Sequence, residues 1–417
     1  MINKSHALLL AALLTPAAAL SQGPDSSGAT QQTLSASGTY GHPVPDGCAL
    51  AGGPVAARPV PAPPPAALLP AQLEVRTPLQ PTAFPSGDRH YLIYELHLRN
   101  FGGEPLELQG LEVMGEDGTE QPIAAFGEEQ LASLLFPRGH QMSAEEADDS
   151  RQLDAGQGAV AYLCLAFERG VAVPALLRHR VLLRDAYADG PSIRTGHTRL
   201  RTLAPPVEGP DWIAAGGPGN TSHHRAELLV IGGNARISRR YAIDWRQVRD
   251  GATFAGDALE ARAYHAYGEP VFAVAEGTVV SARDGLPDNV PRTPKGFDTA
   301  VAITMETIAG NAVTLDLGGG EYALYAHMAP GSVQVKPGDH VKRGQVLGRI
   351  GNSGDSREPH LHFEVTDSPD LLAGEGLPYL FDRYGIRLPE GRLDRRANEL
   401  PMLEMLIDFR PTEEVSR

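Results

Sequence analysis

Cysteine and long apolar runs are scarce in this 417-residue sequence, and acidic residues outnumber basic ones. The formal net charge of −15 disfavours a nucleic-acid partner, which requires a basic face. No segment after the N-terminus reaches the roughly 20 apolar residues that a membrane-spanning helix needs. The hydrophobic fraction of 42% and charged fraction of 21% are those of a globular chain, and they exclude global disorder.

The two cysteines, Cys48 and Cys164, lie in very different surroundings. Neither has neighbours at the spacing of a metal site, so a cysteine-based zinc site is not indicated. Cys48 lies in a low-complexity stretch and Cys164 in an apolar, strand-like run. The sequence therefore leaves open both a disulfide and a buried free thiol at Cys164. Cys48 also lies too far from the N-terminus to indicate a lipid anchor.

Residues 1–21 have the pattern of a secretory signal peptide. Lys4 supplies a basic start, Ala7–Leu14 is a short apolar core, and Ala19-Leu20-Ser21 permits cleavage before Gln22. We therefore expect a periplasmic or secreted protein. Residues 22–70, rich in proline, alanine and glycine, predict an extended linker.

Residues 71–203 predict a β-sandwich accessory domain. Leu92, Tyr94, Leu96 and Leu98 alternate with polar residues, which is typical of a half-buried strand. Further short apolar runs are separated by glycine, aspartate and proline turns, with no long helical period. Isolated histidines here form no catalytic constellation.

Residues 204–417 predict a second β-rich domain with little helix. Strands are expected near 228–231, 241–245, 270–280, 301–308, 312–317, 322–326 and 402–407. The segment 284–298 is expected to be a loop. Residues 333–348 predict a hairpin, because Pro337-Gly338 and Arg343-Gly344 flank a short strand. The whole chain is thus predicted to be all-β.

The chemistry of the second domain is concentrated in Gly351–Val365. His360 and His362 are two residues apart, so in a strand their imidazoles leave the same face. Imidazole is the commonest protein ligand for zinc. A third histidine, His327, follows Tyr325-Ala326 upstream.

Together these segments resemble the lysostaphin-type, or LytM-like, zinc metallopeptidases. The resemblance rests on Tyr325-Ala326-His327, on the hairpin pattern Val335–Gln345, and on the run Gly351–Glu364, which contains Pro359-His360-Leu361-His362-Phe363-Glu364. It covers about residues 220–370. It implies a LytM-like fold with this hairpin, one bound Zn²⁺, and hydrolysis of peptide bonds in peptidoglycan.

Carried over by motif position, the resemblance assigns Asp244 and His362 as metal ligands and His327 and His360 as the catalytic pair. One position departs from the pattern. The residue four before Asp244, where the family has its first ligand histidine, is Arg240. A guanidinium stays charged and offers no lone pair to a metal.

Two hypotheses follow from Arg240. In the first, the metal is kept and another histidine replaces the lost ligand: His224, its neighbour His223, or His265. In the second, Arg240 puts its charge where zinc would lie and pairs with Asp244, leaving a metal-free groove. Because Asp244, His327, His360 and His362 are all present, we favour the first hypothesis, with His224 as the ligand.

The predicted function is that of a zinc-dependent endopeptidase acting on peptidoglycan peptides. The alternative is a catalytically degenerate protein of the same fold that binds the cell wall or regulates a wall amidase through contact. A peptidase acting on other secreted proteins is a third possibility. No nucleic-acid partner is expected.

Overall fold

The computed structural model describes residues 45, 47–52, 70–116, 121–137, 151–196, 198–293, 298–388 and 392–411. These ranges all belong to one unit, Tyr40–Arg417. The predicted signal peptide and most of the predicted linker lie outside the described residues. None of the helices in the described ranges is both long and apolar enough to cross a membrane.

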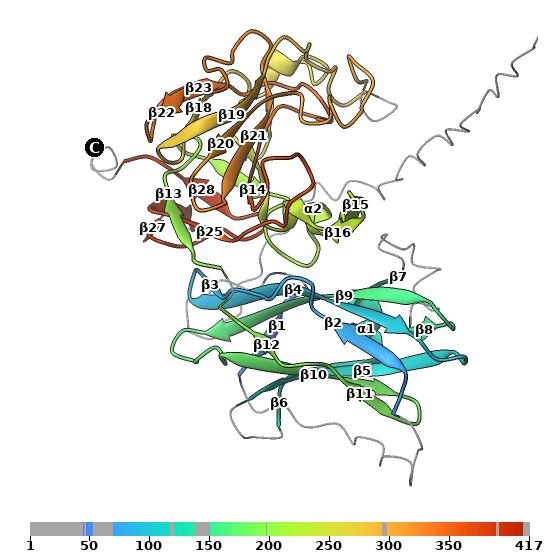
Figure 1. The fold of residues 1–417 in the computed structure, drawn as a ribbon. Coiled ribbons are helices and arrows are strands. Elements are labelled where there is room, and N and C mark those ends of the chain that lie inside the picture. The colour runs from blue at the N-terminus through green and yellow to red at the C-terminus, as the bar shows by residue number, and fades with distance from the viewer. Residues whose placement is uncertain are drawn as a thin grey trace, which may run out of the picture. The chain divides into compact units, whose positions relative to one another are not determined.

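The first part of the chain folds into two antiparallel sheets that share one apolar core (Figure 1). In one sheet the order is β1 (Ala49–Ala51), β9 (Gly158–Glu168), β4 (Arg89–Asn100) and β2 (Leu73–Arg76), with β3 (Phe84–Ser86) on β4 and β7 (Leu135–Pro137) on β9; only β1 runs parallel to its neighbour. The other has the order β11 (Tyr187–Asp189), β10 (Leu176–Leu183), β5 (Leu106–Gly115) and β6 (Pro122–Gly127), with β12 (Ile193–Arg194) on β10 and β8 (Gln152–Leu153) on β5. Helix α1 (Glu128–Leu134) follows β6. We call this part the two-sheet domain.

Strand β4 is buried on both of its faces. Leu92, Tyr94 and Leu96 point into the core of the two-sheet domain, as their alternation predicts. Tyr91 and Ile93, on the opposite face, belong to a second core that includes Trp212 and other residues of the C-terminal part. The two parts of the chain therefore share a buried apolar contact through β4.

The C-terminal part is built on one long sheet. Its order is β22 (His340–Val341), β19 (Gly277–Arg283), β20 (Asn311–Asp316), β21 (Tyr322–Met328), β24 (Leu361–Thr366), β17 (Ile243–Gln247), β14 (Trp212–Ala215), β28 (Leu406–Asp408), β26 (Tyr384–Arg387) and β27 (Leu393–Arg396). Small pairs join β15 (Leu229–Ile231) to β16 (Asn234–Arg236), β18 (Pro270–Phe272) to β23 (Val346–Arg349), and β13 (Arg201–Leu203) to β25 (Tyr379–Phe381). Short helices are α2 (His223–Ala226), η2 (Ser238–Tyr241) and η3 (Ala261–Ala263). The prediction of an all-β chain with little helix is confirmed.

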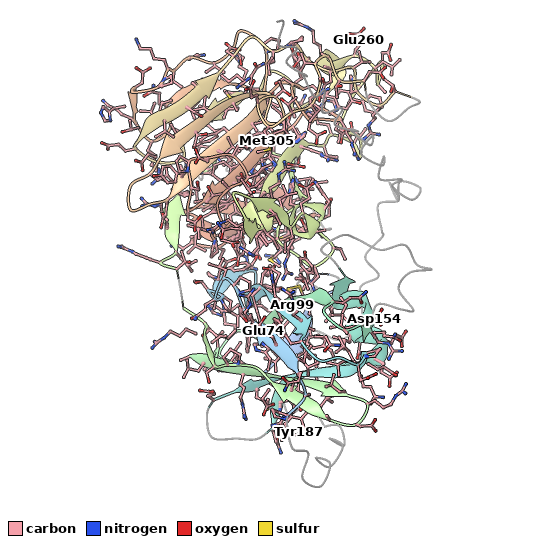
Figure 2. All side chains as sticks on the ribbon, turned by 45° about the vertical axis from the view of Figure 1, so that its right-hand side comes forward. Glu74, Arg99, Asp154, Tyr187, Glu260 and Met305 are labelled. Carbon is pink, nitrogen blue, oxygen red and sulfur yellow. A yellow bond between two sulfur atoms is a disulfide. The ribbon has the colours of Figure 1, made fainter. Side chains whose placement is uncertain are left out.

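Two local predictions are wrong. Residues 301–308 form turns instead of a strand, because Thr304 and Thr307 hydrogen-bond to nearby backbone and to each other. Met305 in this segment is 51% exposed (Figure 2). The predicted hairpin at 333–348 contains β22 and β23, but these strands pair with β19 and β18 instead of with each other.

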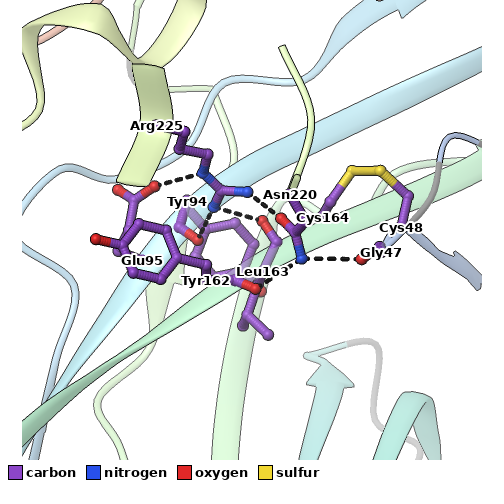
Figure 3. Close-up of a disulfide and its surroundings, with 9 residues drawn as sticks. All are labelled: Gly47, Cys48, Tyr94, Glu95, Tyr162, Leu163, Cys164, Asn220 and Arg225. Carbon is purple, nitrogen blue, oxygen red and sulfur yellow. Dashed lines mark hydrogen bonds and ion pairs between the residues drawn. A yellow bond between two sulfur atoms is a disulfide. The ribbon is translucent and has the colours of Figure 1, made fainter. Parts of the chain in front are cut away.

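The structure also settles the cysteine alternatives. Cys48 and Cys164 form a disulfide, so Cys164 is not a free thiol (Figure 3). Next to Cys48, β1 pairs in parallel with β9, so this piece of the predicted linker is part of a sheet. Likewise β13, just before the predicted boundary at 203/204, pairs with β25 of the C-terminal part. The sequence showed neither contact because both strands are only three residues long.

Candidate metal centre

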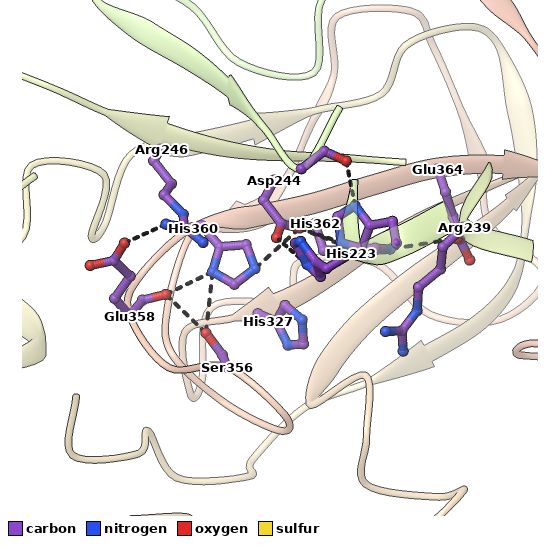
Figure 4. Close-up of polar contacts among 12 residues, drawn as sticks. His223, Arg239, Asp244, Arg246, His327, Ser356, Glu358, His360, His362 and Glu364 are labelled. Carbon is purple, nitrogen blue, oxygen red and sulfur yellow. Dashed lines mark hydrogen bonds and ion pairs between the residues drawn. The ribbon is translucent and has the colours of Figure 1, made fainter. Parts of the chain in front are cut away.

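Strands β17, β24 and β21 bring three of the predicted site residues together. Asp244 on β17 pairs directly with His362 on β24, and His362 pairs in turn with Ala326 on β21. His327 follows Ala326 with a left-handed backbone, φ +65°, which is uncommon for a residue with a side chain. His360 directly precedes β24. The central strands of the sheet therefore gather these side chains at one place (Figure 4).

The fourth histidine comes from helix α2. His224 is buried, and its Nδ1 lies 2.8 Å from the carbonyl oxygen of Gly216. A carbonyl can only accept, so Nδ1 carries the proton and Nε2 presents a lone pair. That Nε2 lies 3.3 Å from Oδ1 of Asp244. Gly216 has φ +59°, the left-handed conformation that glycine adopts without strain.

Asp244 is the centre of the cluster. Its Oδ1 lies 2.9 Å from Nδ1 of His362, 3.3 Å from Nε2 of His224 and 3.4 Å from Nε2 of His360. Its Oδ2 lies 3.7 Å from Nε2 of His223, a half-exposed neighbour. His223, His224 and Asp244 form a group whose ligand atoms all lie within 4.8 Å of one another.

The two remaining imidazoles are oriented by backbone carbonyls. His327 donates from Nδ1 to the Ser353 carbonyl at 2.8 Å. His360 donates from Nδ1 to the Glu358 carbonyl at 2.7 Å, with the Ser356 hydroxyl 3.3 Å away. In both rings Nδ1 is thus occupied and Nε2 is the remaining nitrogen, which in His360 lies near Asp244. The two ring centroids lie 4.9 Å apart.

Burial and mutual contact set the charges of this cluster. Burial opposes ionisation of Asp244, but the His224 and His360 imidazoles beside it hold its pKa well below the ordinary value. Burial, reinforced by His360 and His362, lowers the pKa of His327 well below its usual range. For His362, burial is outweighed by the hydrogen bond to Asp244 and the nearby Glu364 carboxylate, which raise its pKa to about 9. The site thus strongly favours positive charge next to Asp244.

The donor set fits a zinc ion. Zinc–nitrogen and zinc–oxygen bonds of 2.0–2.2 Å in a tetrahedron place ligand atoms roughly 3.3 Å apart. The His224–Asp244 separation of 3.3 Å matches that value, and the His362–Asp244 separation of 2.9 Å is slightly shorter. Each imidazole also has the outer partner typical of a ligand: Gly216 for His224, and Glu364, 3.5 Å from Nε2, for His362.

Arg240 does not lie in this cluster. Its guanidinium donates from Nε to Glu95 at 2.9 Å and from Nη2 to Glu375 at 2.9 Å, and Nη1 lies 3.3 Å from the Gly376 carbonyl oxygen. Within the described residues, the charged partners of Asp244 are all histidines. The hypothesis that Arg240 pairs with Asp244 is therefore wrong.

The three alternative ligands differ in their burial and in their distance from Asp244. His224 is buried against Asp244, whereas the His223 side chain is 53% exposed and farther from the carboxylate. His265 follows η3, where its backbone N–H bonds the Thr253 carbonyl, and it is not among the partners of Asp244 in the described part of the chain. Of the three candidates, His224 is the one that the structure brings to Asp244 and His362.

Several residues of the site were missed from sequence. Gly216, Ser353 and Glu358 act through backbone carbonyls, which carry no side-chain signature. Glu364 stands two residues after His362 and thus on the same strand face, a spacing that could have identified it. Its Oε2 makes no hydrogen bond in the described structure.

A pocket adjoins the cluster. It is lined by the β19–β24 face and the 305–310 segment, and its walls include Met305, Glu306, Ala309, Gly310 and Glu364. The carbonyl of Ala309 accepts the backbone N–H of His327 at 2.9 Å, so this wall is joined directly to the histidine pair.

Comparison with known proteins agrees with the motif. Residues 261–372 match the model of peptidase family M23. Peptidoglycan DD-endopeptidase ShyA of Vibrio cholerae is 34% identical over 80 residues, which cover 19% of this chain and 18% of ShyA. Cell division protein DipM of Caulobacter vibrioides is 39% identical over 62 residues, 15% of this chain and 10% of DipM. The chain thus spans less than a fifth of the length of these relatives.

Two solved structures are also similar. The catalytic domain of lysostaphin from Staphylococcus simulans is 25% identical, with 38% of this chain and 83% of that one covered and a TM-score of 0.21. The M23 metalloprotease pseudoalterin is 18% identical, with 51% and 98% covered and a TM-score of 0.26.

Proposed function

The chain carries a LytM-like domain of peptidase family M23, and on that premise we propose that it is a zinc-dependent endopeptidase that cleaves peptide bonds in peptidoglycan. One observation carries the proposal. Three imidazole nitrogens lie within 3.4 Å of a single buried carboxylate oxygen, on Asp244. A carboxylate oxygen surrounded by three imidazole nitrogens is a donor set of the kind that holds a divalent cation once the nitrogens have lost their protons.

His224, Asp244 and His362 would hold the metal. A Zn²⁺ ion held there would supply Lewis acidity, which lowers the pKa of a bound water and polarises a peptide carbonyl. The chain itself contributes orientation: Gly216 fixes the tautomer of His224, and Glu364 faces the outer nitrogen of His362.

His327 and His360 would move the protons. The carbonyls of Ser353 and Glu358 hold their Nδ1 atoms, so each ring presents Nε2 as the reactive nitrogen. An imidazole in this state takes a proton at Nε2, and once protonated it donates from Nε2 to an oxyanion or a leaving amine. The adjoining pocket, with Glu306 and Glu364 on its walls, would hold the peptide beside them.

The cell wall is the substrate that agrees with all the indications together. ShyA, the relative with a peptidoglycan activity in its name, supports it. The signal pattern of residues 1–21 would deliver the protein to that compartment. The net charge of −15 disfavours a nucleic-acid substrate, because such a substrate requires a basic binding face.

The test is release of peptide fragments from purified peptidoglycan by the full chain, with and without a chelator. We expect chelator-sensitive release that His360→Ala lowers at least about 100-fold, because proton transfer contributes that much. The matched control is His340→Ala, an exposed histidine on β22, which should leave release unchanged.

Metal content is measured on the same variants. His362→Ala and His224→Ala should both bind zinc much more weakly and retain little of it through purification, whereas His360→Ala should retain it. If only His362→Ala loses zinc, the assignment of His224 is wrong. Wall binding without release would support the amidase-regulating alternative. Cleavage of unstructured protein but not of wall would support a general secreted peptidase.

A further inference from the structure

Helix α2 is only four residues long, yet it places His224 against Asp244. So short a helix has no stability of its own and must be held from outside. The residue after His224 shows how. Arg225 is fully buried, and its side chain reaches Tyr94, Glu95 and Leu163 of the two-sheet domain (Figure 3).

Every nitrogen of the Arg225 guanidinium is engaged. Nε donates to Glu95 Oε1 at 2.8 Å. Nη2 donates to the carbonyls of Tyr94 at 2.7 Å and Leu163 at 2.8 Å, on neighbouring strands β4 and β9. Nη1 donates to the amide oxygen of Asn220, four residues before His224. Both sides of the His224 helix turn are thereby fixed to one sheet.

Glu95 holds a second element at the same time. Its other oxygen, Oε2, accepts from Arg240 at 2.9 Å. Arg240 lies in η2, directly before the strand that carries Asp244. One buried carboxylate of the two-sheet domain thus connects the segments that supply His224 and Asp244. Because two arginines share Glu95, a second carboxylate, Glu375, pairs with Arg240.

Asn220 extends the contact to the disulfide. Its Nδ2 donates to the carbonyls of Gly47 and Tyr162, both at 2.8 Å, and Gly47 precedes Cys48. The Cys48–Cys164 bond keeps that segment on β9. The contacts of Arg225 and Asn220 therefore join α2 to groups on, or covalently bound to, the two-sheet domain.

We propose that Glu95 is a positioning residue for the metal centre: through Arg225 it fixes α2, and through Arg240 it fixes η2, which packs against α2, so that His224 can act as a ligand. The two-sheet domain is then a structural part of the metal site and more than an accessory module. This inference rests on the proposed function, since it assumes that His224 binds metal.

The test is Zn²⁺ affinity of the full chain, measured by competition with a chromophoric chelator. Glu95→Gln should weaken zinc binding about 10- to 100-fold, the range for removing a partner that orients a ligand. The control is Glu112→Gln, a buried carboxylate of the same domain on β5, which should leave affinity unchanged.

A double-mutant cycle distinguishes positioning from general damage. If Glu95 acts through His224, then Glu95→Gln should change zinc affinity less than about threefold when His224 is already alanine. An equal loss in both backgrounds, or no loss in either, would overturn the proposal. If Glu95→Gln does not fold, Asn220→Ala serves the same cycle with a smaller expected loss of about three- to tenfold.

The two proposals fail in different ways. If the wild-type chain binds no zinc, or if His362→Ala binds as tightly as wild type, the proposed function falls and this inference with it. If zinc binding depends on His362 but is indifferent to Glu95, this inference alone is wrong.

Discussion

At position 240 the sequence departs from the ligand pattern of the family that it resembles, and the structure shows where the side chain lies instead. Arg240 occupies the motif position of a ligand, but its side chain turns to Glu95 and Glu375. Strand β17, which follows, carries Asp244, and helix α2 places Nε2 of His224 3.3 Å from its carboxylate. This proximity to Asp244 is why His224 is proposed as the ligand in place of the residue at position 240.

Replacing Arg240 by methionine should lower the free energy of unfolding by about 3–5 kcal/mol, because Glu375 and one oxygen of Glu95 lose their buried cation. Urea unfolding of the metal-free protein measures this loss. Arg343→Met, which breaks a partly exposed pair with Asp382, is the control and should cost under about 1 kcal/mol. Equal losses of unfolding free energy in the two variants would show that the buried ion pairs of Arg240 stabilise the protein no more than the exposed pair does.

At this scale the sequence predicted a good deal of the candidate site. His327, His360, His362 and Asp244 lie together, and they were identified because side-chain identity and strand spacing are visible in a motif. The place of His224 could only be proposed as one of three options. Its position depends on α2, which depends on contacts with residues more than a hundred positions away in the chain.

At the scale of elements, the turn before α2 leaves little room for an added side chain. A Cβ added to Gly216 would lie 2.7 Å from Cε1 of His223 and 3.0 Å from Nδ1 of His224. The second distance is too short for an ordinary contact, so His224 would have to move. The left-handed φ of +59° adds backbone strain.

Gly216→Ala should therefore weaken zinc affinity about tenfold or more, in addition to lowering stability. Gly232 is a matched control: its φ is +58°, but no atom lies within 4 Å of an added Cβ. Gly232→Ala should cost similar backbone strain and leave zinc affinity unchanged. The measurement is chelator competition together with thermal unfolding. Equal zinc affinity in the two variants would contradict the prediction.

The sequence predicted strands correctly where buried and exposed residues alternate, and incorrectly where they do not. The inner face of β4 follows the alternation of Leu92, Tyr94 and Leu96. Glu95 was expected on a polar face and is 3% exposed, because that face is covered by another part of the chain. Residues 301–308 have the apolar content of a strand, but local side-chain hydrogen bonds fold them into turns.

At the scale of the whole molecule, the strand and turn patterns predicted an all-β chain but not how its parts join. Phe84, Tyr91 and Ile93 pack in the same core as Trp212 and Tyr241. An alternating pattern reveals one buried face of a strand, and it cannot reveal that the other face is also covered. The shared core and the Glu95 ion pairs explain why the stability of the two parts should be coupled.

That coupling makes the pH dependence of global stability informative. His179 on β10 is fully buried, hydrogen-bonded to the Tyr94 hydroxyl at 2.8 Å, and burial lowers its pKa to about 3. In the unfolded chain the same histidine takes a proton near pH 6.5. Between these values the unfolded state binds more protons than the folded state. Stability is therefore complete above pH 6.5 and falls as the pH decreases below it, by up to about 1.4 kcal/mol per pH unit.

Replacing His179 by asparagine removes this titration. Relative to the variant, the wild type should lose about 1 kcal/mol more between pH 7 and 5.5, a window above the range in which most carboxylates titrate. Urea unfolding at both pH values measures the difference, and His340→Asn, at an exposed histidine, is the control. Tyr94, the partner of His179, is next to Glu95 on β4, and Glu95 is proposed to support the metal centre. Unfolding should therefore be monitored by two signals, zinc release and fluorescence. If both signals weaken at the same pH, the two-sheet domain and the metal centre unfold as one unit; if zinc is retained while the two-sheet domain unfolds, the coupling through Glu95 is absent.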